Sequence, residues 1–232
     1  MKQPGQSEFT FKTGGPVVAS PSFSPDGGIV YLASRDSTLY AVDRSTGALL
    51  WSFESGGPLV SSPVVSPDGD TVYVGSLDGN LYAVKCMQCM GKGTKSWGLD
   101  FGMYMESSPS VSPDGKTLYV GSRNGKVHAL DSSTGGILWV FESGGSVKST
   151  PTVSLDGGTI FFGSSDKKVY AVATETGVKR WEFETGGPVE VPPMLGPDGL
   201  TLFVGSQDGK MYALEGKKEG GAALWEFTSA GS

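Results

Sequence analysis

The segment "SPDGGIVYLASRDSTLYAVDRSTGALLWSFESGG", residues 24–57, decides the fold. It contains short apolar runs rich in β-forming residues, separated by the pair Asp36-Ser37 and by the turn "RSTG". No run keeps a 3.6-residue period over helical length, and such pairs between apolar runs indicate hairpins. In later units the pairs are Asp78-Gly79, Asn124-Gly125, Asp166-Lys167 and Asp208-Gly209, and Asp-Gly and Asn-Gly suit type I′ turns. The predicted strands of this unit cover residues 17–23, 29–34, 38–43 and 48–54.

The same unit recurs along the chain. The turn "SPDG", or a close variant, begins at residues 24, 66, 112, 154 and 196, so successive units start 42, 46, 42 and 42 residues apart. Five units of about 42 residues therefore fill residues 14–225. Repeated units of this length with four antiparallel strands are typical of β-propeller blades. We predict an all-β propeller of five four-stranded blades, with part of a larger propeller ring as the alternative.

A proline recurs in the first predicted strand of every unit. Proline cannot donate to a β-ladder and therefore belongs on an edge strand. In a propeller, the first strand of each blade lines the central channel and has such an edge. The prolines are Pro21, Pro63, Pro109, Pro151 and Pro193.

The consensus "VYVGSxDGxLYAVDxxTGxxxWxFxxGG" resembles the pyrroloquinoline-quinone-type (quinoprotein-like) propeller repeat. The match includes Val72–Ser76, Leu81–Val84 and the recurring Thr-Gly pairs. The competing WD-repeat class is disfavoured because the chain has no Trp-Asp or Gly-His dipeptide. The resemblance implies that a tryptophan on the outermost strand of each blade packs between neighbouring blades. These structural residues are Trp51, Trp97, Trp139, Trp181 and Trp225.

We expect residues 1–8 to be a disordered N-terminal segment and residues 9–232 to form one propeller domain. The outer-strand pattern occurs six times for five blades, because residues 9–16 also carry it. Phe9 replaces the tryptophan in that copy, so the C-terminal copy at residues 225–232 is the better outer strand for the last blade. We predict a closed monomeric ring, with completion by association or by a longer array as the alternative.

Bulk properties exclude some partner classes. The net charge of −6 and the pI near 4.8 argue against nucleic acid, which requires clustered basic residues. No run approaches the roughly 18 apolar residues of a membrane span, and residues 1–9 lack the apolar core of a secretory signal. The localisation stays open, although the resemblance implies a family whose members are often periplasmic, extracellular or luminal.

No catalytic constellation can be placed. Enzymes of the resembled family bind pyrroloquinoline quinone in the channel funnel and have adjacent cysteines, a metal-ligand set and a catalytic aspartate, none of which can be assigned in this chain. The repeated aspartates of the "PDG" turns fit turn geometry. His128, the only histidine, occupies a position that is tyrosine in the other blades and is interpreted as a packing residue. We therefore predict no catalytic residues, no cofactor and a non-enzymatic protein.

Positions that vary between repeats but share one surface are candidates for binding. One such column precedes the inner strand, and a second lies in the hairpin between the second and third strands. Blade three also carries Met-Tyr-Met where its neighbours have Gly-Pro-Val or Gly-Ser-Val, and aromatic residues with methionines are common at interfaces. The predicted interaction face comprises Met103, Tyr104, Met105, Glu106, Lys148, Glu190, Arg35, Arg123 and Gln207.

We therefore predict a scaffold for protein–protein interaction with an unidentified protein partner. The alternative is a binder of a small polar ligand or pyrroloquinoline quinone in the channel funnel. A five-bladed axis is narrow, which favours the scaffold.

Cys86 and Cys89 form a CxxC motif in a loop four residues longer than its counterparts. Such a motif can hold a redox disulfide or half of a zinc site. No second CxxC accompanies it, so a tolerated insertion is the favoured interpretation. A local disulfide, or a metal shared between two chains, stays open.

Overall fold

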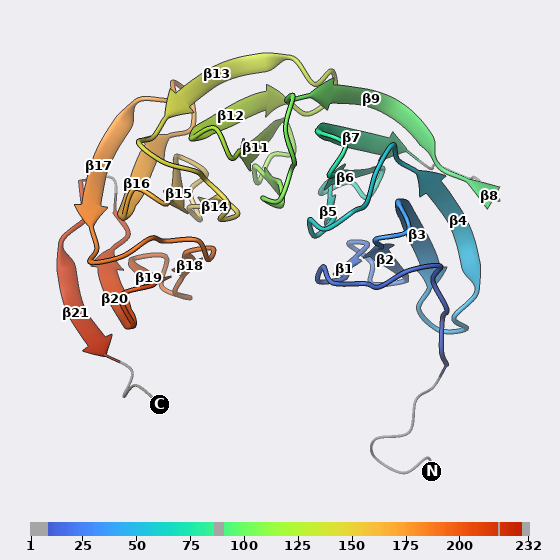
Figure 1. Cartoon of the computed structure of the whole chain (residues 1–232), viewed down its shortest axis with the longest axis horizontal. Coiled ribbons are helices and arrows are strands. Elements are labelled where there is room, and N and C mark those ends of the chain that lie inside the picture. The colour runs from blue at the N-terminus through green and yellow to red at the C-terminus, as the bar shows by residue number, and fades with distance from the viewer. Residues whose placement is uncertain (1–8, 86–90, 218, 229–232) are drawn as a thin grey trace, which may run out of the picture.

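The computed structural model describes residues 9–85, 91–217 and 219–228. Within these ranges the chain is all-β, with 21 strands in five sheets that follow one another as blades. Figure 1 shows the blades side by side, with the outer strands on the convex side and the short first strands on the concave side. The predicted propeller of four-stranded blades is confirmed.

Each blade begins with a two-residue strand on the concave side and continues with three longer strands. Blade 1 contains β1 (Ser22–Phe23), β2 (Ile29–Ala33), β3 (Thr38–Asp43) and β4 (Leu49–Glu54). Blade 2 contains β5 (Val64–Val65), β6 (Thr71–Gly75), β7 (Asn80–Lys85) and β9 (Thr94–Asp100). Blade 3 contains β10 (Ser110–Val111), β11 (Thr117–Gly121), β12 (Lys126–Asp131) and β13 (Ile137–Glu142). Blade 4 contains β14 (Thr152–Val153), β15 (Thr159–Gly163), β16 (Lys168–Ala173) and β17 (Lys179–Glu184). Blade 5 contains β18 (Met194–Leu195), β19 (Thr201–Gly205), β20 (Lys210–Glu215) and β21 (Ala223–Thr228).

The longer loop of blade 2 adds an unpredicted strand to its neighbour. The short strand β8 (Gly91–Lys92) pairs in parallel with β4, and Trp51 lies opposite Gly91. Blade 1 is therefore a five-stranded sheet. Cys86 and Cys89 lie outside the described residues, directly before β8.

The first strands are shorter than predicted. In blade 1 the ladder begins with Ser22 opposite Tyr31, so Pro21 lies directly before the strand and not within it. Because proline has no backbone N–H to donate, pairing starts at the residue that follows it. The other four blades begin in the same way.

The hairpins between second and third strands also differ from the predicted type I′ turn. Only the second residue of each central pair has a positive φ, as at Ser37 (70°) and Gly79 (95°). The Ser37 amide donates to the Ser34 carbonyl, and the Ser34 amide donates to Thr38. This is the three-residue loop, in which a type I turn is followed by one left-handed residue.

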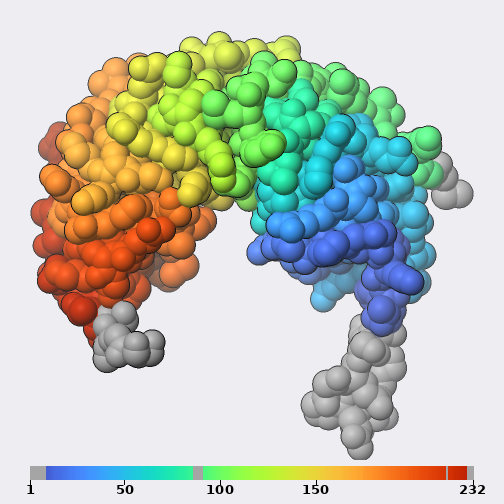
Figure 2. All heavy atoms as spheres, viewed as in Figure 1, coloured from blue at the N-terminus to red at the C-terminus, as the bar shows by residue number. Residues whose placement is uncertain are grey.

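The five blades form an open arc, so the predicted closed ring is wrong for this chain. In Figure 1 the first and last blades lie at the two ends of the arc, and Figure 2 shows the open side between them. The strand β21 pairs with β20, so the C-terminal copy completes blade 5, as predicted. Large side chains fill the four junctions between neighbouring blades, and no junction joins blade 5 to blade 1 among the described residues. The argument from a narrow axis consequently does not apply.

The junction between blades 4 and 5 shows how the arc is held together. Trp181, only 9% exposed, packs on Gly221 of the next blade, and its indole Nε1 donates to the Lys217 carbonyl at 2.8 Å. Trp97 and Trp139 donate in the same way to backbone carbonyls of the next blade. Trp51 packs on Gly93 of blade 2. Trp225 lies at the open end and is 46% exposed.

Close backbone approach at the junction between blades 4 and 5 leads to a testable prediction. A Cβ atom on Gly163 would lie 2.6 Å from the Val189 carbonyl oxygen, whereas on Gly205 its nearest neighbour would be Val191 Cγ2 at 3.3 Å. Gly163→Ala should lower the free energy of unfolding by about 1–3 kcal/mol through overpacking. The matched change Gly205→Ala should cost less than about 0.5 kcal/mol. Denaturant titration of both variants would measure this, and equal losses would contradict it.

Candidate interaction face

Two sets of loops meet at one end of the blades. In a four-stranded antiparallel blade, the hairpin between the second and third strands lies at the same end as the connection to the next blade. We call this end the hairpin face. Backbone bonds hold the two sets together, because the amides of Arg35, Leu77 and Gln207 donate to prolines of the adjoining connections at 2.9 Å. Both variable columns of the sequence therefore lie on the hairpin face.

In blade 3 the two columns are joined by an ion pair. Arg123 donates through Nε and a terminal nitrogen to the two carboxylate oxygens of Glu106, at 3.0 and 2.7 Å. Both side chains are partly exposed, so the pair contributes at most about 1 kcal/mol to stability. The bidentate geometry does fix the orientation of both groups.

Glu190 is the centre of a larger polar cluster that spans blades 4 and 5. One carboxylate oxygen accepts bonds from Lys148 Nζ at 2.8 Å and Ser165 Oγ at 3.0 Å, and the other accepts from Gln207 Nε2 at 3.0 Å. The bond from Lys148 lowers the pKa of Glu190 below its usual value. The Glu190 carboxylate therefore stays ionised at neutral pH. The recurrence of Lys and Glu at one repeat position, 42 residues apart, is the sequence signal for it.

A hollow of about 460 Å³ lies beside the cluster at the end of the arc. Glu190 and Gln207 line one part of it, and Pro188 and Val191 line another. The polar groups that face the hollow are the same ones that already bond to each other. The hollow therefore offers a ligand only the hydrogen-bonding capacity that Glu190 and Gln207 do not already use.

The predicted aromatic-methionine loop is divided between surface and core. Tyr104 is 57% exposed and Met103 is half-buried, but Met105 is fully buried beside Leu81 and Val120. Met105 therefore cannot contact a partner, and its assignment to the interaction face is wrong. Its amide donates to the Ser76 carbonyl, which is the bond that a core valine makes in the next two blades.

The hairpin face has an uneven composition. At the variable positions, blades 1 and 2 contribute the apolar side chains Val18, Val60 and Leu77. Val18 is 56% exposed. Arg35 is the exposed charged residue at the variable positions of these two blades. Blades 3 to 5 contribute the two charged clusters and Tyr104. The face thus offers an exposed aromatic side chain and charges held in fixed orientations.

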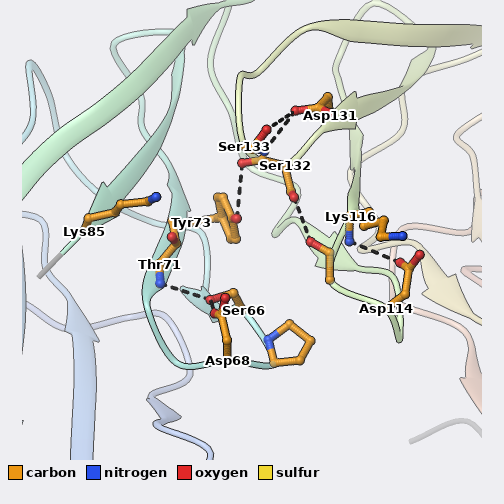
Figure 3. Close-up of a pocket in the computed structure, with 12 residues that line it drawn as sticks. Ser66, Asp68, Thr71, Tyr73, Lys85, Asp114, Lys116, Asp131, Ser132 and Ser133 are labelled. Carbon is orange, nitrogen blue, oxygen red and sulfur yellow. Dashed lines mark hydrogen bonds between the residues drawn. The ribbon is translucent and has the colours of Figure 1, made fainter. Parts of the chain in front are cut away.

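The opposite end of the blades contains pockets of a different origin. Figure 3 shows one of about 550 Å³ between blades 2 and 3, which is lined by Lys85, Lys116 and three aspartates. These carboxylates accept bonds from their own turns, as Asp131 does from Ser133 Oγ at 2.7 Å. Smaller pockets recur at the next two junctions. The recurrence indicates a product of the repeat geometry and not a specific site.

His128 replaces the tyrosine that bonds an aspartate in the other four blades, as Tyr82 does to Asp78 at 2.6 Å. It is 7% exposed, lies edge-on to Phe101, and its Nδ1 has no hydrogen-bond partner in the described part of the chain. Burial, with a smaller contribution from Lys126, lowers its pKa to about 4. His128 is a buried neutral side chain, in agreement with a packing role.

Metal ligands and membrane spans are two further features that a site or an anchor would require. No group of three or more His, Cys, Asp or Glu side chains that could hold a metal ion occurs among the described residues. The same residues contain no helix with the length and apolar character needed to cross a membrane.

Comparison with known proteins places the chain among propellers. The family model described as outer membrane protein assembly factor BamB matches residues 2–88 and 90–232. No curated protein sequence matches the chain. Among solved structures, BamB from Moraxella catarrhalis is similar, with a TM-score of 0.77 and 20% sequence identity. The similarity covers 96% of this chain and 67% of the Moraxella catarrhalis chain, so this chain matches about two thirds of that protein's length.

Proposed function

Because the chain belongs to the family of the outer membrane protein assembly factor BamB, we propose that it is a non-enzymatic propeller scaffold that binds a protein partner on the hairpin face. The family description names a role in protein assembly, and the part that we extend to this chain is the binding of another protein. The partner's identity is left open.

Tyr104 is the observation that carries the proposal. It is more than half exposed, in a loop that replaces the small residues of the neighbouring blades. The ion pair of Glu106 with Arg123 begins two residues further along and presents oriented charges beside it. A large aromatic side chain next to fixed charges is a composition that favours protein contacts, where a few aromatic residues supply most of the binding energy.

The Glu190 cluster supports a protein partner more than a small polar ligand. Its carboxylate already accepts bonds from three neighbours. A small ligand would have to compete with all of them. A protein surface can instead contact the preformed cluster as it is, without breaking its internal bonds.

The test is capture of partners by the immobilised full chain. Tyr104→Ala should weaken binding of a specific partner by about 2 kcal/mol or more, with an unchanged thermal melt. Leu155→Ala is the matched control, since Leu155 is 69% exposed but lies in a turn at the opposite end of the blades. It should capture as much partner as the wild type. Equal recovery of every protein by all three forms would contradict the proposal.

A further inference from the structure

The two faces of a blade differ in composition. At every junction, one face of a blade packs on the opposite type of face of the next blade. In blade 4, the face toward the following blade carries its tryptophan, and we call this side of any blade its Trp face. It packs on side chains of blade 5 that include Tyr212, and we call that side the Tyr face. At this junction the Trp face contributes Phe161, Val169, Ala171 and Trp181, and the Tyr face contributes Leu202, Val204, Tyr212 and Leu214.

At one end of the arc the Trp face of blade 5 is uncovered. Met194 is 66% exposed, Trp225 46% and Phe227 58%, and Met211 and Phe203 complete the same side. In blade 4 the counterparts Phe161, Val169 and Trp181 are buried in the junction, and Phe183 is partly buried against it. We call this set of five residues the open face. Strand pairing places Met194 beside Phe203 and Met211 beside Phe227, so the exposed apolar side chains are neighbours on one side of the sheet, and exposed apolar patches mark interaction sites.

At the other end, the Tyr face of blade 1 is covered by the N-terminal residues 9–14. Phe9 lies against Gly47 as Trp139 lies against Gly177. The ring of Phe11 meets Tyr40 edge-on at 5.4 Å.

The similarity continues to the end of this segment. The Gly14 amide donates to Asp36 at 2.7 Å, just as Gly144 donates to Asp166 at 2.7 Å. Residues 9–14 thus take the place of the outer strand of a preceding blade, although they belong to no sheet.

This cover is incomplete. Phe9 is 36% exposed, whereas the tryptophans at the four internal junctions are buried (Trp51 and Trp181) or half-buried (Trp97 and Trp139). Phe23, on the Tyr face of blade 1, is 54% exposed, although its counterpart Leu195 packs against the junction core. A tryptophan-bearing sheet would bury more of this face than the N-terminal segment does.

We propose that the open face of blade 5 binds the Tyr face of blade 1 in a second copy of this chain. Trp225 and Phe227 would then take the places of Phe9 and Phe11, and the N-terminal segment would be displaced. Four internal junctions already join these two face types in the same chain, so a fifth such contact needs no new chemistry. The contact is head-to-tail and extends to a ring or a longer chain of copies, depending on whether the rotation closes.

Sedimentation velocity of the full chain over a wide concentration range tests the proposal. The wild type should associate reversibly at high concentration. Releasing the segment with Phe9→Ser and Phe11→Ser should shift association to at least about tenfold lower concentration, because the competitor is weakened. Phe9→Trp should have the opposite effect, because it restores the side chain of the repeat.

Removing the open face should abolish association in either background. The variant for this purpose carries Trp225→Ser and Phe227→Ser. Leu155→Ser and Tyr104→Ser, which change exposed residues elsewhere, should associate as the wild type does. The second of these also separates this contact from the proposed partner site on the hairpin face.

Three results would overturn the proposal. One is a folded Phe9→Ser, Phe11→Ser variant that stays monomeric at every concentration, which would leave the open face to a blade of another polypeptide. Another is association that survives loss of Trp225 and Phe227. The third applies if the segment-release variant does not fold. In that case, a wild-type chain that sediments as a monomer up to its solubility limit would overturn the proposal.

Discussion

Replacing Trp181 with alanine is expected to lower the free energy of unfolding by about 3–5 kcal/mol, the cost of emptying a buried aromatic site. Its indole fills the junction between blades 4 and 5, and its Nε1 bonds to the Lys217 carbonyl at 2.8 Å. The change removes the packing and leaves that carbonyl without its donor. Denaturant titration would measure the loss.

Trp225 provides the matched control, because it occupies the same repeat position on a sheet with no following blade. It is 46% exposed, so Trp225→Ala should cost less than about 1 kcal/mol when measured at concentrations low enough to keep the chain monomeric. Similar losses for both variants would mean that burial at the junctions is not what stabilises the arc.

Acidification is expected to destabilise the chain through His128. Its folded pKa of about 4 lies below its ordinary value of 6.5. Above pH 6.5 the side chain is neutral in both folded and unfolded states, so its contribution is fully present. Between pH 6.5 and 4 the unfolded state binds a proton that the folded state does not, so the free energy of unfolding decreases as the pH is lowered. The total loss should reach about 3 kcal/mol below pH 4.

The control restores the pair found in the other blades. A variant with His128→Tyr and Asn124→Asp recreates the aspartate–tyrosine bond seen between Asp166 and Tyr170. The difference in unfolding free energy between this variant and the wild type should widen as the pH falls from 6.5 to 4. A constant difference over this range would show that His128 does not titrate on unfolding in the expected way.

The repeat made much of the fold readable from the sequence. Turn signals and apolar runs recur in register, so local preferences at residues such as Asp36 and Gly79 agree with the blade in every unit. Both variable columns were also placed correctly on one end of the blades, because antiparallel connectivity leaves only one arrangement. Strand lengths and turn types were less accurate, since they depend on how the blades meet at the axis.

The sequence by itself determined the number of blades, their strands and the positions of the side chains that join them, because these follow from short-range pattern and repeat length. Only the tertiary structure decided that the arc stays open, that Met105 is core while Tyr104 is exposed, and that Phe9 and Phe11 cover blade 1. Each of these depends on the angle and volume of a junction between blades. That geometry is set by contacts between residues about 42 positions apart, which local pattern does not encode.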